Sequence, residues 1–277
     1  MVLKLKLNYF NAPIFRIFII LSLAAMIALQ NDILPLKNAE ASTISSTIQS
    51  VADLNKQQKY ETSINILLSA LSKNPNSESL IVTFKQTFTL HIYNQILDGF
   101  KSIALNPHDT NAYLLIARSY GLMGDPTKAM ETLLDGTIDN PDSVNLWTAI
   151  GAMELQAHRD TEALSVFKEI IRIDLKNGNA HNNIAYILAE SNDQRIHNLK
   201  NALAYAEEAN SLEPNNANFI DTLAGIKFQL GQKTEALSLI KQAINLSPHE
   251  DYFRKQLSKF QANTEKAVIY QKAALVK

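Results

Sequence analysis

Apolar residues recur at intervals of three and four along most of the chain, which is the spacing that places them on one face of an α-helix. In the stretch 110–143, one such run contains Ile116 and a second contains Leu133, and the turn-forming residues Gly124-Asp125-Pro126 lie between them. The same arrangement returns in later stretches of similar length. The pattern therefore predicts pairs of helices, each pair joined by a short turn.

Five prolines mark the ends of these helix pairs and reveal their period. They are Pro75, Pro107, Pro141, Pro214 and Pro248, and the gaps between them are 32, 34, 73 and 34 residues. The gap of 73 residues corresponds to two periods with one proline missing. A repeat of about 20 to 50 residues indicates an array in which each unit buries its apolar face against its neighbours. We therefore predict an all-α solenoid of helical hairpins.

The period divides the chain into an N-terminal segment, an array of units and a terminal region. The predicted segments are 1–41, then an array over 42–250 with units 44–77, 78–109, 110–143, 144–177, 178–216 and 217–250, and finally capping helices over 251–277. The unit 178–216 is five residues longer than the 34-residue period, so we expect a protruding loop from Ser191 to Lys200. The unit 78–109 is two residues short and has no turn signal around Leu90 to Tyr93, so it forms either a distorted hairpin or one long helix.

Small residues recur at two positions of each unit, where they allow the two helices of a hairpin to approach closely. They are Ala117, Gly151, Ala185 and Ala224 in the first helices, and Ala129, Ala163, Ala202 and Ala236 in the second. This pattern, with Thr-Glu-Ala-Leu at 161–164 and again at 234–237, resembles the tetratricopeptide repeat (TPR) of about 34 residues. The segments 182–190 and 221–225 are similar to a repeat pair of exported bacterial TPR proteins. The resemblance implies a right-handed superhelical solenoid with a C-terminal capping helix.

The resemblance also implies a concave groove, lined by the first helix of each hairpin, that binds a protein or peptide. Its groove positions correspond here to Asn111, Leu114, Arg118, Asn145, Thr148, Ala152, Asn179, Asn182, Tyr186, Asn218, Asp221 and Gly225. Only Arg118 is basic among them, which disfavours a cluster of cations that would hold a C-terminal carboxylate. We expect a neutral or partly apolar peptide or helix instead.

Asparagine stands at the second position of four successive units, at Asn111, Asn145, Asn179 and Asn218. We prefer the interpretation that these residues cap the first helices, because asparagine accepts a backbone N–H well. The alternative is a ladder of side-chain amides that hydrogen-bond an extended peptide.

The N-terminus has the features of a targeting segment. Lys4, Lys6 and Arg16 make it basic, the residues from Ile17 to Leu29 carry no charge, and Ala39-Glu40-Ala41 offers a small-x-small cleavage pattern. We expect export with cleavage after Ala41, which gives a periplasmic or extracytoplasmic protein. If cleavage fails, the segment 14–36 becomes an anchor in the inner membrane with its positive end inside.

The composition and the spacing of reactive residues argue against several kinds of functional site. The chain has no cysteine, which excludes disulfides and thiolate metal sites, and its 26 basic and 27 acidic residues indicate no polyanionic partner such as nucleic acid. Two Ser-x-x-Lys strings, at 165–168 and 238–241, could suggest a serine nucleophile with a lysine base. Both stand at one offset inside the second helix, so we attribute them to the repeat. No two of the six histidines are spaced to hold a metal on one helix face.

We therefore expect no catalytic residue, cofactor or metal, and a non-enzymatic scaffold that binds a partner protein in its groove. The resemblance suggests assembly of an envelope, pilus, secretion or exopolysaccharide system. An accessory domain that acts on carbohydrate or peptidoglycan is the alternative, and groove aromatics beyond Tyr186 would favour it.

Overall fold

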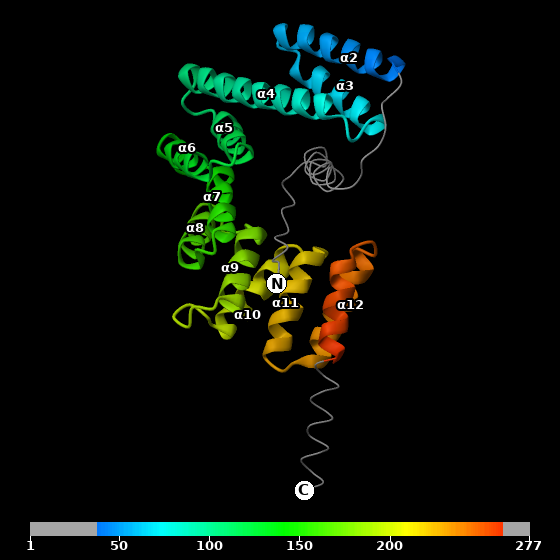
Figure 1. Ribbon diagram of the computed structural model, residues 1–277. Coiled ribbons are helices and arrows are strands. Elements are labelled where there is room, and N and C mark those ends of the chain that lie inside the picture. The colour runs from blue at the N-terminus through cyan, green and yellow to red at the C-terminus, as the bar shows by residue number, and fades with distance from the viewer. Residues whose placement is uncertain (1–37, 263–277) are drawn as a thin grey trace. The chain divides into compact units, whose positions relative to one another are not determined.

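The computed structural model describes residues 38–262, and every regular element within this range is a helix (Figure 1). The helices are α2 (Asn38–Lys56), α3 (Tyr60–Lys73), α4 (Glu78–Leu105), α5 (Thr110–Leu122), α6 (Pro126–Asp139), α7 (Val144–Gln156), α8 (Asp160–Ile173), α9 (Gly178–Glu190), α10 (Leu199–Leu212), α11 (Ala217–Gln229) and α12 (Lys233–Leu246). Residues 251–262 are helical as well. The predicted all-α fold of sequential helical hairpins is confirmed.

The predicted signal segment lies almost entirely outside the described residues, as does the end of the predicted cap. Within 38–262, no helix combines the length and the apolar character that crossing a membrane requires. The described residues divide into two compact units, a first unit up to Thr132 and a second unit from Leu133 on, and the boundary falls inside α6. Each unit has its own hydrophobic core.

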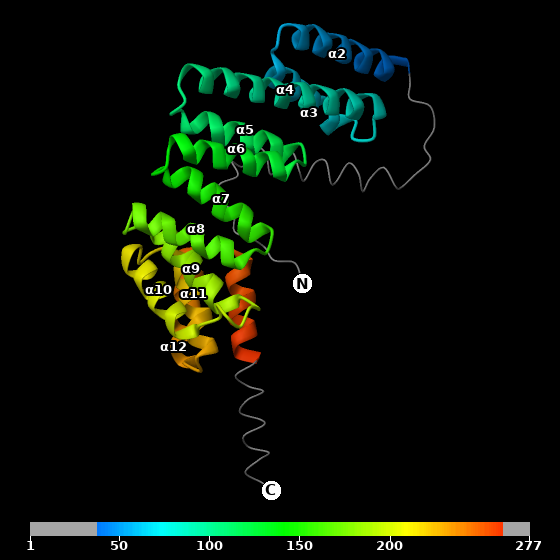
Figure 2. The ribbon, with the colours of Figure 1, turned by 90° about the vertical axis from the view of Figure 1, so that its left-hand side faces the viewer.

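In the first unit, α2 and α3 form a hairpin that packs against α4. Leu67 and Leu80 are fully buried there and Phe84 is almost so, because the apolar stripes of all three helices meet. The second half of α4 packs against α5 through Ile92, Ile96 and Ile116. Figure 2 shows α4 extending along this unit beside helices about half its length.

The segment 78–109 forms one 28-residue helix, α4, followed by a short turn, so the structure has the second of the two predicted alternatives, one long helix rather than a distorted hairpin. The physical reason lies in the middle of the segment, where Leu90 to Tyr93 include no glycine or proline that would break the helix. Gly99 then permits close contact with α5, since a Cβ atom at this position would lie 2.5 Å from Cγ1 of Ile116.

In the second unit, the hairpins α7–α8, α9–α10 and α11–α12 pack in chain order. Ala185 and Ala202 are completely buried in the α9–α10 hairpin, as expected for positions where two helices approach closely. Large side chains such as Ile184 and Phe167 fill the space between successive hairpins. The array thus follows the division into small and large positions that the sequence predicts.

The connection between α9 and α10 covers residues 191–198, within the predicted loop. The Ser191 hydroxyl donates to Oδ2 of Asp160 at 2.6 Å, and the backbone N–H of Asn198 donates to the carbonyl of Leu188 at 2.8 Å. In the middle of the loop, hydrogen bonds from Arg195 lower the pKa of Asp193 to about 2. The loop is therefore fixed to the array at both of its ends.

The helix 251–262 is more than a polar cap, because it contributes two buried aromatic rings. Phe253 is 1% exposed and Phe260 is 3% exposed. The Phe260 ring stacks on Phe228 of α11, with centroids 4.4 Å apart. Counting from the start of each unit, Phe253 holds the position of Phe219 in α11. The helix thus occupies the place of the first helix of a further unit.

Candidate functional site

The N-terminal ends of the first helices show which residues cap them. Asp109 accepts from the backbone N–H groups of Asn111 and Ala112, Ser143 accepts from that of Leu146, and Asn177 accepts from that of Ala180. Asn216 likewise accepts from the N–H of Asn218.

The preferred capping role for Asn111, Asn145, Asn179 and Asn218 is therefore wrong, because each of them lies two residues inside the helix that it was expected to cap. Asn111, Asn145 and Asn179 are exposed, and Asn218 is partly buried. The capping residues precede them by two positions and are Asp, Ser, Asn and Asn, which are the favoured capping types, so this signal was available in the sequence. The amide ladder stays a prediction.

Two matched alanine substitutions separate the capping position from the groove position. We expect Asn177→Ala to lower the free energy of unfolding by about 1 kcal/mol, since it removes the cap of α9. Asn179→Ala, two residues further on, should change it by less than about 0.5 kcal/mol, as for an ordinary surface position. Urea unfolding of the two variants measures the difference, and equal losses would contradict the assignment of the cap.

In the second unit, the groove positions of α9 and α11 bring buried polar groups together. Asp221 is only 7% exposed. The side-chain oxygen of Asn182 is buried and meets no hydrogen-bond donor among the described residues. Tyr186 is partly buried, and burial raises the pKa of its phenol, with smaller contributions from Glu190 and Asp160. An unsatisfied buried acceptor costs free energy, so this face contains polarity that the packing of the array does not explain.

The helix 251–262 adds Tyr252 to this group. Burial raises the pKa of its phenol well above the ordinary range, and Asp221, which hydrogen-bonds the hydroxyl, raises it further. Gln256 donates to the Tyr252 oxygen at 3.2 Å. Sequence reasoning missed Tyr252, although it stands at the same offset in its unit as Asn218 and the other groove asparagines.

The surroundings of Tyr186 are acidic. Oε1 of Glu190 accepts from Nε2 of Gln229 at 2.6 Å, which connects the ends of α9 and α11. Asp160 and Asp221 are the other carboxylates that act on the two tyrosines. We call Asn182, Tyr186, Glu190, Asp221 and Tyr252 the tyrosine–acid cluster. It offers hydrogen-bond acceptors, negative charge and two rings, which suits binding of a ligand that donates hydrogen bonds.

The other groove candidates lie apart from this cluster. Arg118 is exposed on α5 in the first unit, together with Asn111. Thr148 is partly exposed on α7 in the second unit, and Asn145 is exposed one turn before it. At the equivalent offsets of the helix 251–262 stand Lys255 and Lys259, both exposed.

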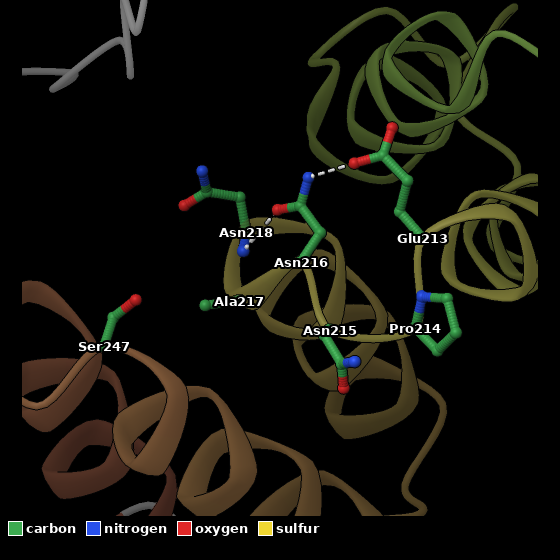
Figure 3. A pocket seen from close by; sticks show the side chains of 7 residues that line it. All are labelled: Glu213, Pro214, Asn215, Asn216, Ala217, Asn218 and Ser247. Carbon is green, nitrogen blue, oxygen red and sulfur yellow. Dashed lines mark hydrogen bonds between the residues drawn. The ribbon is translucent and has the colours of Figure 1, made fainter.

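A hollow of about 560 Å³ lies where the turn before α11 meets the end of α12 (Figure 3). It is lined by Glu213, Pro214, Asn215, Asn216, Ala217, Asn218 and Ser247. Nδ2 of Asn216 donates to Oε2 of Glu213 at 2.9 Å, and Oδ1 of Asn216 accepts from the N–H of Asn218 at 3.1 Å. These groups satisfy one another and hold the start of α11 in place, and the Asn218 side chain is directed away from Glu213 in Figure 3.

The residues considered for other chemistry do not converge. Ser165, Lys168, Ser238 and Lys241 are exposed on α8 and α12, which is the surface side of the second helices. Within the described part of the chain, no three residues among His, Asp and Glu are grouped so that they could hold a metal ion.

The fold and the cluster define a protein built from repeated helical hairpins with a polar, acidic patch on its first helices. Residues 111–143 match the family model described as a tetratricopeptide repeat. The match falls on the helical hairpin formed by α5 and α6. No protein with a curated description matches the sequence.

Several solved structures are similar to this chain. YrrB, a TPR protein whose structure has "an unusual peptide-binding site", is 18% identical, with a TM-score of 0.48 over 60% of this chain and 84% of its own. TTC0263, a thermophilic TPR protein of Thermus thermophilus, is 16% identical, with a TM-score of 0.48 over 79% of this chain and 99% of its own. MamA of Desulfovibrio magneticus RS-1 is 16% identical, with a TM-score of 0.49 over 60% and 92%. Such values transfer no role to this chain.

Proposed function

We propose that this protein is a non-enzymatic scaffold that binds a segment of a partner protein on the first-helix face of its second unit. The side chain of Asn182 carries the proposal, because it is partly exposed on this face while its oxygen has no donor among the described residues, so a rotation of the amide would offer that oxygen to a ligand that donates a hydrogen bond. The carboxylates of Glu190 and Asp221 beside Tyr186 and Tyr252 favour a ligand with a cationic side chain. This differs from the neutral segment expected from the sequence.

The N-terminal sequence supports a location for this activity. The basic flank, the uncharged core and the Ala39-Glu40-Ala41 pattern fit export with cleavage after Ala41. We propose that the mature protein acts outside the cytoplasm in the assembly of an envelope, pilus, secretion or exopolysaccharide system. N-terminal sequencing of the protein recovered from cells tests the cleavage, and a start at Ser42 is expected.

Replacing Asn182 by leucine tests the binding role. Leucine has a similar size and removes the buried unsatisfied oxygen, so we expect stability to stay the same or rise. Peptides that bind the full-length protein are first selected from a random library. Their affinity for the Asn182→Leu variant should be at least about tenfold lower, because one hydrogen bond to the ligand is lost.

Asn210→Leu is the matched control. Asn210 also has a buried side-chain oxygen without a donor among the described residues, but it lies on the second helix α10. Its replacement should affect stability in the same direction and leave peptide affinity unchanged. If both variants bind the selected peptides as the original protein does, the first-helix face is not the binding surface.

A carbohydrate-binding role is the second candidate, and Tyr252 is the observation that favours it. Sugar sites use aromatic faces together with Asp and Asn side chains, and Tyr252 adds a second aromatic residue to Tyr186 and Asp221. Co-sedimentation with peptidoglycan that is lost in Tyr252→Ala, but kept in Asn210→Leu, would support this role over peptide binding.

A further inference from the structure

Helix α4 exposes a continuous apolar stripe. Val82, Leu90, Tyr93, Leu97 and Phe100 are between 45% and 55% exposed. Their spacing of eight, three, four and three residues places them on one face of the helix. Elsewhere in the described residues, Leu134 and Ile138 lie one turn apart on α6, and the other exposed large apolar side chains, such as Met123 and Leu230, stand singly. Single exposed apolar residues are ordinary, whereas a contiguous patch indicates an interaction site.

The second half of α4 takes the place that the second helix of each regular hairpin takes in its unit. Comparison with those helices shows that the array does not require this stripe. Counting back from the start of the following unit, Leu97 is equivalent to Glu131, Ser165 and Ser238, and Phe100 is equivalent to Leu134, Lys168 and Lys241. All of these equivalent residues are exposed. These outward positions are thus polar in the regular hairpins except at Leu134, whereas both are apolar in the long helix.

We propose that this stripe, from Leu90 to Phe100, is an interface between two copies of the protein. The spacing of three, four and three residues is that of a coiled-coil seam. If two copies of α4 cross antiparallel about a two-fold axis between Tyr93 and Leu97, then Leu90 faces Phe100 and Tyr93 faces Leu97 across the axis. The stripe is therefore complementary to itself, which is what a two-fold interface needs.

The charges near the stripe are compatible with this pairing. Between residues 86 and 104 the charged side chains are Asp98 and Lys101, and Nζ of Lys101 lies 3.0 Å from Oδ1 of Asp98 in the same helix. Neither belongs to the stripe, so two copies can meet without bringing like charges together. The same low charge would leave a basic or acidic partner without a matching group on this surface.

The size of the stripe sets the expected strength of the dimer. The four side chains of the interface, each about half exposed, bury roughly 100 Å² each, or roughly 800 Å² over both copies. This is below the approximately 1,200 Å² at which specific, stable protein interfaces begin, so we expect a weak dimer with a dissociation constant on the order of tens of micromolar. The interface is separate from the tyrosine–acid cluster, and its existence does not depend on the proposed function.

Sedimentation velocity over a range of concentrations tests the proposal on the full-length protein. We expect a monomer–dimer equilibrium for the original sequence, and monomer alone for Leu97→Glu and for Phe100→Glu. Leu134→Glu is the control, because Leu134 is 45% exposed on α6 at the position equivalent to Phe100. It should dimerise like the original protein. Circular dichroism checks that all three variants are folded.

Disulfide trapping tests the geometry, because the chain contains no cysteine of its own. A mixture of the Tyr93→Cys and Leu97→Cys variants should form a mixed disulfide dimer faster than either variant alone, and Leu134→Cys should not react. The proposal is overturned if the original protein is monomeric at hundreds of micromolar. It is also overturned if Leu97→Glu leaves the association unchanged, since another surface, such as residues 1–37, then holds the copies together.

Discussion

Replacing Phe253 by alanine is expected to lower the free energy of unfolding by about 3 to 5 kcal/mol, as for other large buried aromatic residues. Its ring is 1% exposed and belongs to the same core cluster as Ile220 and Ile240 of α11 and α12. Removal of the ring therefore leaves a cavity at the end of the array. The helix 251–262 has a neighbouring hairpin on one side only, so few side chains can move in to fill that cavity. Urea unfolding followed by far-ultraviolet circular dichroism measures the loss.

Two further variants make this result specific. Phe253→Leu keeps most of the apolar volume and should cost clearly less than alanine. Lys259→Ala changes an exposed residue of the same helix and should stay within about 0.5 kcal/mol of the original protein. If Phe253→Ala costs no more than Lys259→Ala, the helix 251–262 is not packed as part of the array.

Replacing Asp221 by asparagine is expected to weaken the binding of cationic peptides by about 10- to 100-fold, which corresponds to one hydrogen bond to a charged group. Asparagine retains an acceptor for the Tyr252 hydroxyl, so the local packing should persist while the negative charge is lost. Fluorescence anisotropy at low and high salt measures the effect. The original protein should lose affinity as salt rises, and the variant should lose less.

Asp142→Asn is the matched control for charge. Its side chain is 74% exposed and pairs with Arg172 of α8, and it is not part of the tyrosine–acid cluster. This variant should bind the peptides as the original protein does. Equal losses for both variants would show that the peptides respond to overall charge rather than to the tyrosine–acid cluster.

The repeat and its period could be predicted from the sequence because the constraint is local and recurs. Small residues such as Ala185 and Ala202 must stand where two helices touch, and prolines are kept out of helix interiors, so those between helices mark the turns. The helix bounds follow from these positions. The single helix over 78–109 remained one of two alternatives, because the absence of a turn signal between Leu90 and Tyr93 is compatible with either form.

The site was harder to predict because it depends on contacts between units. The family's groove offsets led to Asn182, Tyr186 and Asp221, and the structure places these residues on adjacent first helices. The role of Tyr252 depends on the packing of 251–262 against α11, which becomes evident once Phe253 is recognised as equivalent to Phe219. The capping assignment failed for a different reason, since Asn177 and Asn179 are chemically identical and only the helix start distinguishes them.

Site-specific photo-crosslinking in living cells tests the central claim most directly. A photo-reactive amino acid in place of the exposed Asn179, one turn before Asn182 on α9, reports on the first-helix face, and one in place of Lys168 reports on the exposed surface of α8. The account predicts a discrete protein adduct from position 179 that disappears when Asp221→Asn is added, and no such adduct from position 168. An adduct from position 168 alone, or one from position 179 that Asp221→Asn leaves intact, would contradict it.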